Sequence, residues 1–147
     1  MWREGFSVEL AAWILNALAL AFCAGLGARA LIDPNWAARL VRLRPDEQGF
    51  AEFRASYGGL FLASHAAAFY FTMRWIFGGE AVIGIFAAGA AAALGGGWIG
   101  ASLGRVLAIA SDRALATRFN VRSAGAEAVL ALLIAAPWLA WGLRGLR

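Results

Sequence analysis

The sequence contains no lysine, one cysteine and one histidine, and long parts of it carry no charge at all. A single cysteine excludes an intrachain disulfide. One histidine and one cysteine are too few for a zinc site. The sequence also has no phosphate-binding loop, haem-attachment motif or acidic metal cluster. We therefore predict no catalytic residue, no metal site and no cofactor.

The sequence contains four long hydrophobic segments. Leu10–Ala28, Ala55–Met73 and Ala81–Gly104 contain no Asp, Glu, Lys or Arg, and Ala124–Leu143 contains only Glu127. Each stretch comes close to the roughly 20 residues that a helix needs to cross a bilayer. Inside lipid a helix satisfies its own backbone hydrogen bonds, whereas an isolated strand cannot. The pattern predicts an all-α fold, a bundle of four transmembrane helices.

We expect one integral membrane domain over 1–147, because the chain is 62% hydrophobic and no Pro/Ser-rich linker divides it. Nine of the 13 arginines lie in or beside the two long connections, 29–54 and 105–122, and four lie on the other side. The positive-inside rule then places both connections in the cytoplasm and both termini in the periplasm of a bacterial inner membrane. The net charge of +4 is assigned to this topology and not to nucleic acid. The predicted spans are 8–28, 54–76, 81–105 and 124–143.

A short helix is expected between the first two spans. Asp33 can cap free backbone amides, and Pro34 is tolerated at the first position of a helix. A helix over 34–43 places its large apolar side chains on one face, as in helices that lie in the lipid headgroup layer. A loop helix packed on the end of the bundle is an equal alternative. The residues expected at the membrane surface are Trp36, Arg39, Arg42 and Arg44.

Small residues recur at every fourth position of the third span, from Gly84 to Gly104. This spacing lets helix backbones approach closely within membranes. We expect the track to pack against other helices of the same chain, with a seam between copies of the chain as the alternative. The predicted packing residues are Gly58, Gly59, Gly96, Gly100 and Gly104.

Charged residues at the cytoplasmic helix ends form the candidate site. A charge inside a membrane costs about 2.5–3.5 kcal/mol on insertion scales, so it usually has a partner or a function. Topology brings Arg54, Arg105 and Glu127 to one depth, and Arg105 or Arg54 can keep Glu127 ionised. Asp112, two turns beyond Arg105, is a further expected partner.

The second span adds a polar and aromatic stripe above Arg54. At 100° per residue, Tyr57 and His65 lie on nearly the same face as Arg54. The stripe is interpreted either as the lining of an inward-facing pocket or as a structural feature that fixes helix register. Ser64 and His65 are adjacent, so they do not form a nucleophile–base pair. Phe61 and Thr72 complete the stripe.

At these residues the chain resembles the bacterial membrane proteins grouped as domain of unknown function 4345. The most specific element is Arg-Ala-x-Tyr-Gly-Gly, here 54–59. The resemblance implies a four-helix membrane protein without an established activity, and it marks Arg54, Tyr57, Arg105 and Glu127 as the place to look. The resembling segments are 34–36, 42–46, 52–60 and 104–105, with Asp112 and Glu127.

Three functions stay open from the sequence. The first is a non-enzymatic structural or accessory membrane protein, in a larger complex or a homo-oligomer. The second is a binder or transporter of lipid or another small hydrophobic molecule. The third is a membrane transferase of the glutathione type, which Arg54-Ala55 resembles weakly. In that family a polar Asn and an acidic residue follow, and here Gly58, Gly59 and Leu60 stand instead.

Overall fold

The computed structural model describes residues 7–144, and within them every regular element is helical. The predicted all-α class is therefore confirmed. The termini, which the sequence predicts to be periplasmic, lie outside the described residues. The elements are α1 (Val8–Ile32), α2 (Pro34–Val41), α3 (Glu47–Glu52), the π-helix η1 (Phe53–Leu60), α4 (Phe61–Gly78), α5 (Ala81–Ser111), the 3-10 helix η2 (Arg113–Leu115), α6 (Arg118–Ile134) and α7 (Ala136–Arg144).

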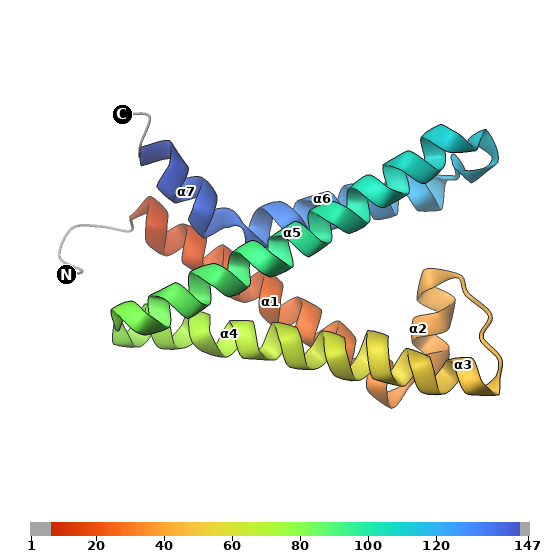
Figure 1. The fold of residues 1–147 in the computed structure, drawn as a ribbon, viewed down its shortest axis with the longest axis horizontal. Coiled ribbons are helices and arrows are strands. Elements are labelled where there is room, and N and C mark those ends of the chain that lie inside the picture. The colour runs from red at the N-terminus through yellow and green to blue at the C-terminus, as the bar shows by residue number, and fades with distance from the viewer. Residues whose placement is uncertain (1–6, 145–147) are drawn as a thin grey trace.

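The long helices form two pairs; in the view of Figure 1 α1 crosses α5, while α4 and α5 meet at one end of the molecule. In one pair α1 packs against α4 and η1, and in the other α5 packs against α6. Beyond the crossing the two pairs diverge toward the end that carries α2, α3 and η2, which gives the molecule two arms. A tight turn joins α4 to α5, with Gly79 in the left-handed region (φ 67°).

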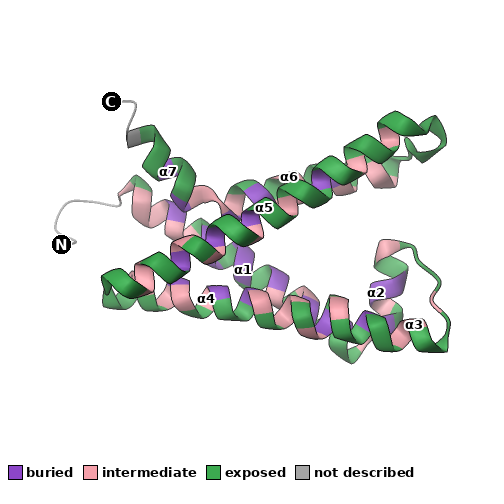
Figure 2. Ribbon diagram, in the orientation of Figure 1, coloured by how far each residue is buried: buried purple, intermediate pink, exposed green. Residues whose placement is uncertain are grey.

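Among the helices of residues 7–144, two are long and apolar enough to cross a membrane on their own. They are α1 and α5, whose mean hydropathy over the best 18-residue window is 1.9 and 1.8. The pair α6 and α7 meets the same test only when it is taken together, and it is bent by 60°. Exposed side chains cover the outer faces of these helices (Figure 2), many of them large and apolar, as contact with lipid requires. These candidate spans indicate a membrane protein, and the predicted span 54–76 is divided between η1 and α4.

Polar side chains start several helices. Ser7 accepts a hydrogen bond from the Leu10 amide, and Thr117 accepts one from the Asn120 amide. Asp33 accepts from the Trp36 amide at 2.9 Å, as the sequence predicts. These caps satisfy amides that a helix start leaves free. They also explain why α6 begins at Arg118, six residues before the predicted span. The apolar run predicts only the part of the helix that fits in lipid. The helix itself continues beyond this part, as far as its capping residue.

The short helix α2 packs on the arm formed by α1 and η1. Ala37 and Ala38 are buried in one cluster with Ala30 and Phe53. The helix stops at Val41, two residues before the predicted end, because the next residue takes a left-handed conformation. The contacts match the predicted loop helix packed on the end of the bundle.

The predicted straight span 124–143 is broken at Ala135, between the end of α6 and the start of α7, and Pro137 is the second residue of α7. Proline has no N–H and cannot donate to the carbonyl four residues earlier. The Trp138 amide bonds the carbonyl of Ala135 at 2.9 Å, so the Ile134 carbonyl loses its usual donor. The side chain of Asn16 on α1 donates to that carbonyl instead.

Asn16 also accepts a hydrogen bond from the hydroxyl of Thr72 on α4, at 2.9 Å. Both side chains are completely buried. One amide therefore joins α1, α4 and the end of α6 beside the main apolar cluster. That cluster consists of Ala19, Leu20, Cys23, Ala68 and Ile134.

The glycines divide into two groups. A Cβ at Gly58 would lie 2.8 Å from the Leu31 backbone, so η1 and α1 approach each other closely there. At Gly96, Gly100 and Gly104 a Cβ would meet nothing within 4 Å, and at Gly59 it would meet only the Arg54 carbonyl, at 3.6 Å.

The predicted packing within the chain is therefore wrong for Gly96, Gly100 and Gly104. The buried alanine and glycine residues of α5 are Ala87, Ala91 and Gly95, each one position before a member of the predicted track. One position rotates a side chain by about 100° around a helix, so the track faces away from α6.

We expect Gly58→Ala to lower the free energy of unfolding by about 1–3 kcal/mol, because an added methyl group forces the backbones of η1 and α1 apart. Gly100→Ala is the matched control, since its methyl group enters open space. Reversible denaturation in mixed micelles measures both. Equal stabilities of the two variants would contradict the assigned close approach.

We expect Asn16→Leu to cost about 1–3 kcal/mol of unfolding free energy, because it leaves the Ile134 carbonyl and the Thr72 hydroxyl without their partner. The same denaturation assay applies, with Ser111→Ala as a control that removes an exposed hydroxyl. In a Pro137→Ala background the helix can continue and the Trp138 amide can reach Ile134. The cost of Asn16→Leu should then be smaller, and an equal cost in both backgrounds would refute the assigned role.

Candidate functional site: a cleft beside the Arg105–Glu127 pair

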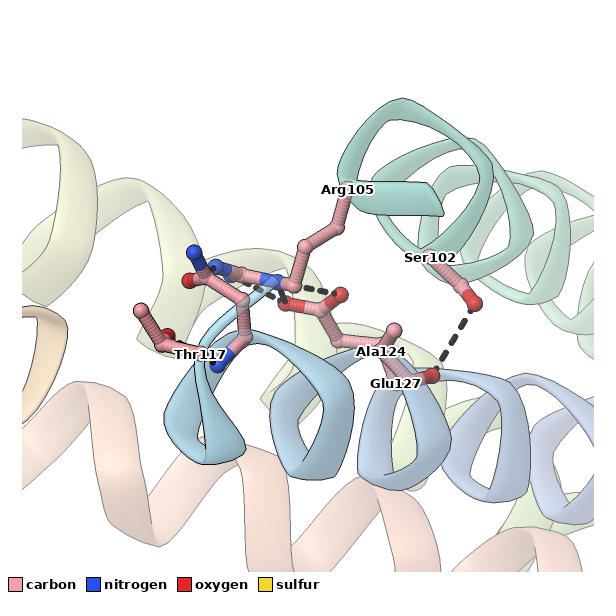
Figure 3. Close-up of polar contacts among 6 residues, drawn as sticks. Ser102, Arg105, Thr117, Ala124 and Glu127 are labelled. Carbon is pink, nitrogen blue, oxygen red and sulfur yellow. Dashed lines mark hydrogen bonds and ion pairs between the residues drawn. The ribbon is translucent and has the colours of Figure 1, made fainter. Parts of the chain in front are cut away.

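Arg105 and Glu127 form the predicted ion pair between α5 and α6 (Figure 3). The Arg105 Nη2 lies 2.6 Å from the Glu127 Oε1, and its Nε lies 3.2 and 3.1 Å from the two carboxylate oxygens. The Arg105 Nη1 also donates to the Asn120 Oδ1 at 3.4 Å. Two parallel contacts of this kind are stronger than a single one and fix the relative orientation of both groups.

Helix spacing explains the placement of these groups. Ser102 lies one turn before Arg105 on α5 and donates to the Ala124 carbonyl on α6 at 2.9 Å. Ala124 in turn lies one turn before Glu127. The hydroxyl contact and the ion pair therefore follow each other along one seam between the two helices, as Figure 3 shows.

The pair leaves part of the guanidinium free. Of the five N–H groups of an arginine, Arg105 uses Nε–H, one from Nη2 and one from Nη1. Two N–H groups stay available. The Glu127 side chain is 13% exposed and that of Arg105 32%. The carboxylate is thus less exposed than the guanidinium.

Arg105 and Glu127 border a cleft of about 570 Å³ between the two arms. One arm contributes Tyr57 and Phe61, the other contributes Trp98 and the ion pair, and α2 closes the remaining side. The walls are largely apolar and aromatic. Its lining is Leu26, Ala30, Trp36, Ala37, Leu40, Val41, Leu43, Ser56, Tyr57, Phe61, Trp98, Ala101, Arg105 and Glu127.

His65 does not line this cleft. It borders a neighbouring pocket of about 280 Å³ that shares Ser56, Phe61, Trp98 and Ala101 with the cleft. Its Nδ1 lies 2.8 Å from the Phe61 carbonyl, and its Nε2 accepts from the Trp98 indole at 3.3 Å. Both ring nitrogens of a neutral imidazole are satisfied when the proton is assigned to Nδ1. The buried histidine positions Phe61 and Trp98.

Two predicted members of the cluster lie elsewhere. Arg54 is exposed and makes no hydrogen bond or ion pair within the described residues. Asp112 is also exposed and caps η2 through the Ala114 amide at 2.8 Å. The predicted pairing of Asp112 with Arg105 or Arg113 is wrong, because α5 ends at Ser111 and the chain turns there.

The π-helix accounts for the position of Arg54. A π-helix has more residues per turn than an α-helix, and η1 covers the Arg-Ala-x-Tyr-Gly-Gly segment. The 100° rotation assumed for the stripe fails across this segment. Tyr57 keeps its place beside the cleft, whereas Arg54 leaves the stripe. The predicted cluster of Arg54, Arg105 and Glu127 is therefore reduced to the last two.

Four polar or aromatic residues of this region were not predicted from the sequence. Asn16 is the one amide side chain within the first apolar stretch, so its position was a usable signal. Asn120 lies seven residues before Glu127, on the same helix face. Ser102 and Trp98 carry no distinguishing pattern in the sequence.

The expected surface residues have varied surroundings. The Arg29 guanidinium lies 4.5 Å above the ring of Trp36. Arg39 makes a loose ion pair with Asp33, at 3.9 Å, and Arg44 is exposed. Arg42 contacts the ring of Phe119 on α6. Within residues 7–144 the structure contains no group of three His, Cys, Asp or Glu side chains that could hold a metal ion.

Comparisons with models of known protein families, with curated proteins and with solved structures find no match. The resemblance to domain of unknown function 4345 stays a prediction. The geometry of the cleft therefore carries the functional argument.

We expect Glu127→Gln to lower the free energy of unfolding by about 2–3 kcal/mol, because a partly buried guanidinium loses its charge partner. Glu80→Gln is the matched control. Glu80 pairs with Arg74 at 3.1 Å, but both side chains are about half exposed, so solvent screens that pair. Denaturation in the same micelles compares the unfolding free energies of the two variants. Equal losses would contradict the assigned difference between the two ion pairs.

Proposed function

We propose that this chain is a non-enzymatic four-helix protein of the bacterial inner membrane that binds a lipid or another amphiphilic molecule in the cleft. The single observation that carries the proposal is that Arg105, with N–H groups left free by its ion pair, borders an otherwise apolar and aromatic space. Ligand sites of this kind combine apolar walls with a few placed polar groups.

The groups that line the cleft restrict the chemical class of the ligand. Glu127 neutralises the charge of Arg105, so the cleft offers hydrogen-bond donors with little net charge. The two free N–H groups suit an acceptor oxygen, such as the carbonyl of an ester or amide. Tyr57, Phe61 and Trp98 offer flat surfaces to a chain or ring. We propose an amphiphile with an apolar body and an acceptor at its polar end.

A second candidate is an accessory subunit or homo-oligomer. The exposed small-residue track of α5 supports it, because Gly96, Gly100 and Gly104 would let another helix approach closely. The glutathione-type transferase gains no support, since Arg54 does not line the cleft.

Native mass spectrometry of the protein extracted in a mild polymer, without added lipid, tests the proposal. We expect a discrete small adduct on the wild type. Ala101→Trp should remove it, because Ala101 lines the cleft and an indole fills the space. Ala93→Trp is the matched control on an exposed position of the same helix and should retain the adduct.

Two results would overturn the ligand proposal: a bare wild-type protomer, or an adduct that survives Ala101→Trp. A stoichiometric assembly of higher mass without an adduct would favour the second candidate. Circular dichroism of both tryptophan variants checks that they retain the helical fold.

A further inference from the structure

A separate pocket of about 360 Å³ is lined by the residue that follows α2 and by the first turns of α6. Its lining is Arg42, Arg118, Phe119, Arg122, Ser123 and Ala126. It shares no residue with the cleft, so an inference about it stands whether or not the cleft holds an amphiphile.

The pocket collects positive charge without compensation. Three of its six lining residues are arginines, and none is acidic. The ion pairs found within the described residues involve Arg39, Arg74 and Arg105, not these three. Like charges gathered in one place repel each other unless an anion joins them. Three arginines without an acidic neighbour in the lining favour the binding of an anion.

The fold positions Arg42 and places Arg118 and Arg122 side by side on α6. Arg42 takes a left-handed backbone conformation at the end of α2 (φ 58°), and its guanidinium lies 4.3 Å above the ring of Phe119. Stacking engages the face of the guanidinium and leaves its in-plane N–H groups free. Arg118 and Arg122 are four residues apart on α6 and so share a helix face.

The donor set fits a phosphate group. Guanidinium groups bind phosphate oxygens in pairs of parallel hydrogen bonds, with more geometric specificity than an ammonium group provides. Ser123 adds a hydroxyl donor to the same pocket. The start of α6 also presents the positive end of its helix dipole on this side. A carboxylate would engage one arginine well, whereas the oxygens of a phosphate can reach several.

We propose that this pocket binds a phosphate group, either the phosphodiester of an anionic phospholipid or a free phosphate. We expect α2 and the start of α6 to lie at the depth of the cytoplasmic lipid headgroups. At that depth the pocket can be reached both by a phospholipid headgroup and by free phosphate. The three arginines supply the charge, and Phe119 orients Arg42.

The test uses the full chain in nanodiscs and measures the thermal unfolding midpoint. One arm compares phosphatidylcholine with phosphatidylcholine containing phosphatidylglycerol. The other arm adds inorganic phosphate to phosphatidylcholine nanodiscs, against chloride at equal ionic strength. We expect the wild type to be stabilised in at least one arm. A response to phosphatidylglycerol alone assigns a lipid, and a response to inorganic phosphate assigns a soluble ligand.

The variant Arg118→Gln/Arg122→Gln should lose that stabilisation, and binding of the active probe in native mass spectrometry should fall about tenfold or more. Arg44→Gln/Arg113→Gln is the matched control, with the same change of charge at exposed positions outside the pocket. It should respond as the wild type does. A wild type that responds in neither arm, or equal losses in both double variants, would overturn the proposal.

Discussion

The arrangement of the long helices depends on one fully buried hydrogen bond, the one that the carbonyl of Ile134 accepts. Beside Pro137 the last helix bends, the Trp138 amide bonds Ala135 instead of Ile134, and Asn16 donates to the Ile134 carbonyl in its place. A buried carbonyl without a partner costs about 1–3 kcal/mol. Because Asn16 also binds Thr72, this requirement fixes the point at which α1, α4 and α6 meet. The two arms diverge from this crossing, and the cleft is the space between them.

In the proposed function the Arg105–Glu127 pair has a structural role and a ligand-binding role, and these concern different parts of the pair. The less exposed carboxylate belongs to the seam between α5 and α6, where a charge without a partner would be costly. The free N–H groups of the guanidinium serve the proposed ligand. A structural role and a ligand-binding role are therefore not alternatives for this pair. The same contact that makes the charge tolerable orients the two N–H groups that stay free.

The sequence predicts those features that follow from charge and from hydrogen-bonding rules. The pairing of Glu127 with Arg105 follows from topology, because both lie at the same end of adjacent apolar stretches. The cap at Asp33 follows from local preference. The bend at Pro137 could have been predicted from the proline itself.

Other features depend on contacts that no local pattern encodes. The π-helix moves Arg54 out of the stripe, and nothing in its six-residue motif indicates that change of register. The face that α5 turns toward α6 differs by one position from the glycine track, so that Gly95 and not Gly96 is buried. Small residues occur on both faces, and only the packing of Ala131 and Ala135 against α5 decides between them.

The crossing and the mouth of the cleft differ in how firmly they are held. At the crossing, fully buried hydrogen bonds join three helices, and separating them exposes polar groups to an apolar surrounding. At the mouth, α2 meets α6 through the contact of Arg42 with Phe119. A cation–π contact at an exposed site contributes only about 0.5–1 kcal/mol. The arms can therefore separate at the mouth at far lower cost than at the crossing. An amphiphile that binds as proposed would enter the cleft at this weakly held end, between α2 and α6.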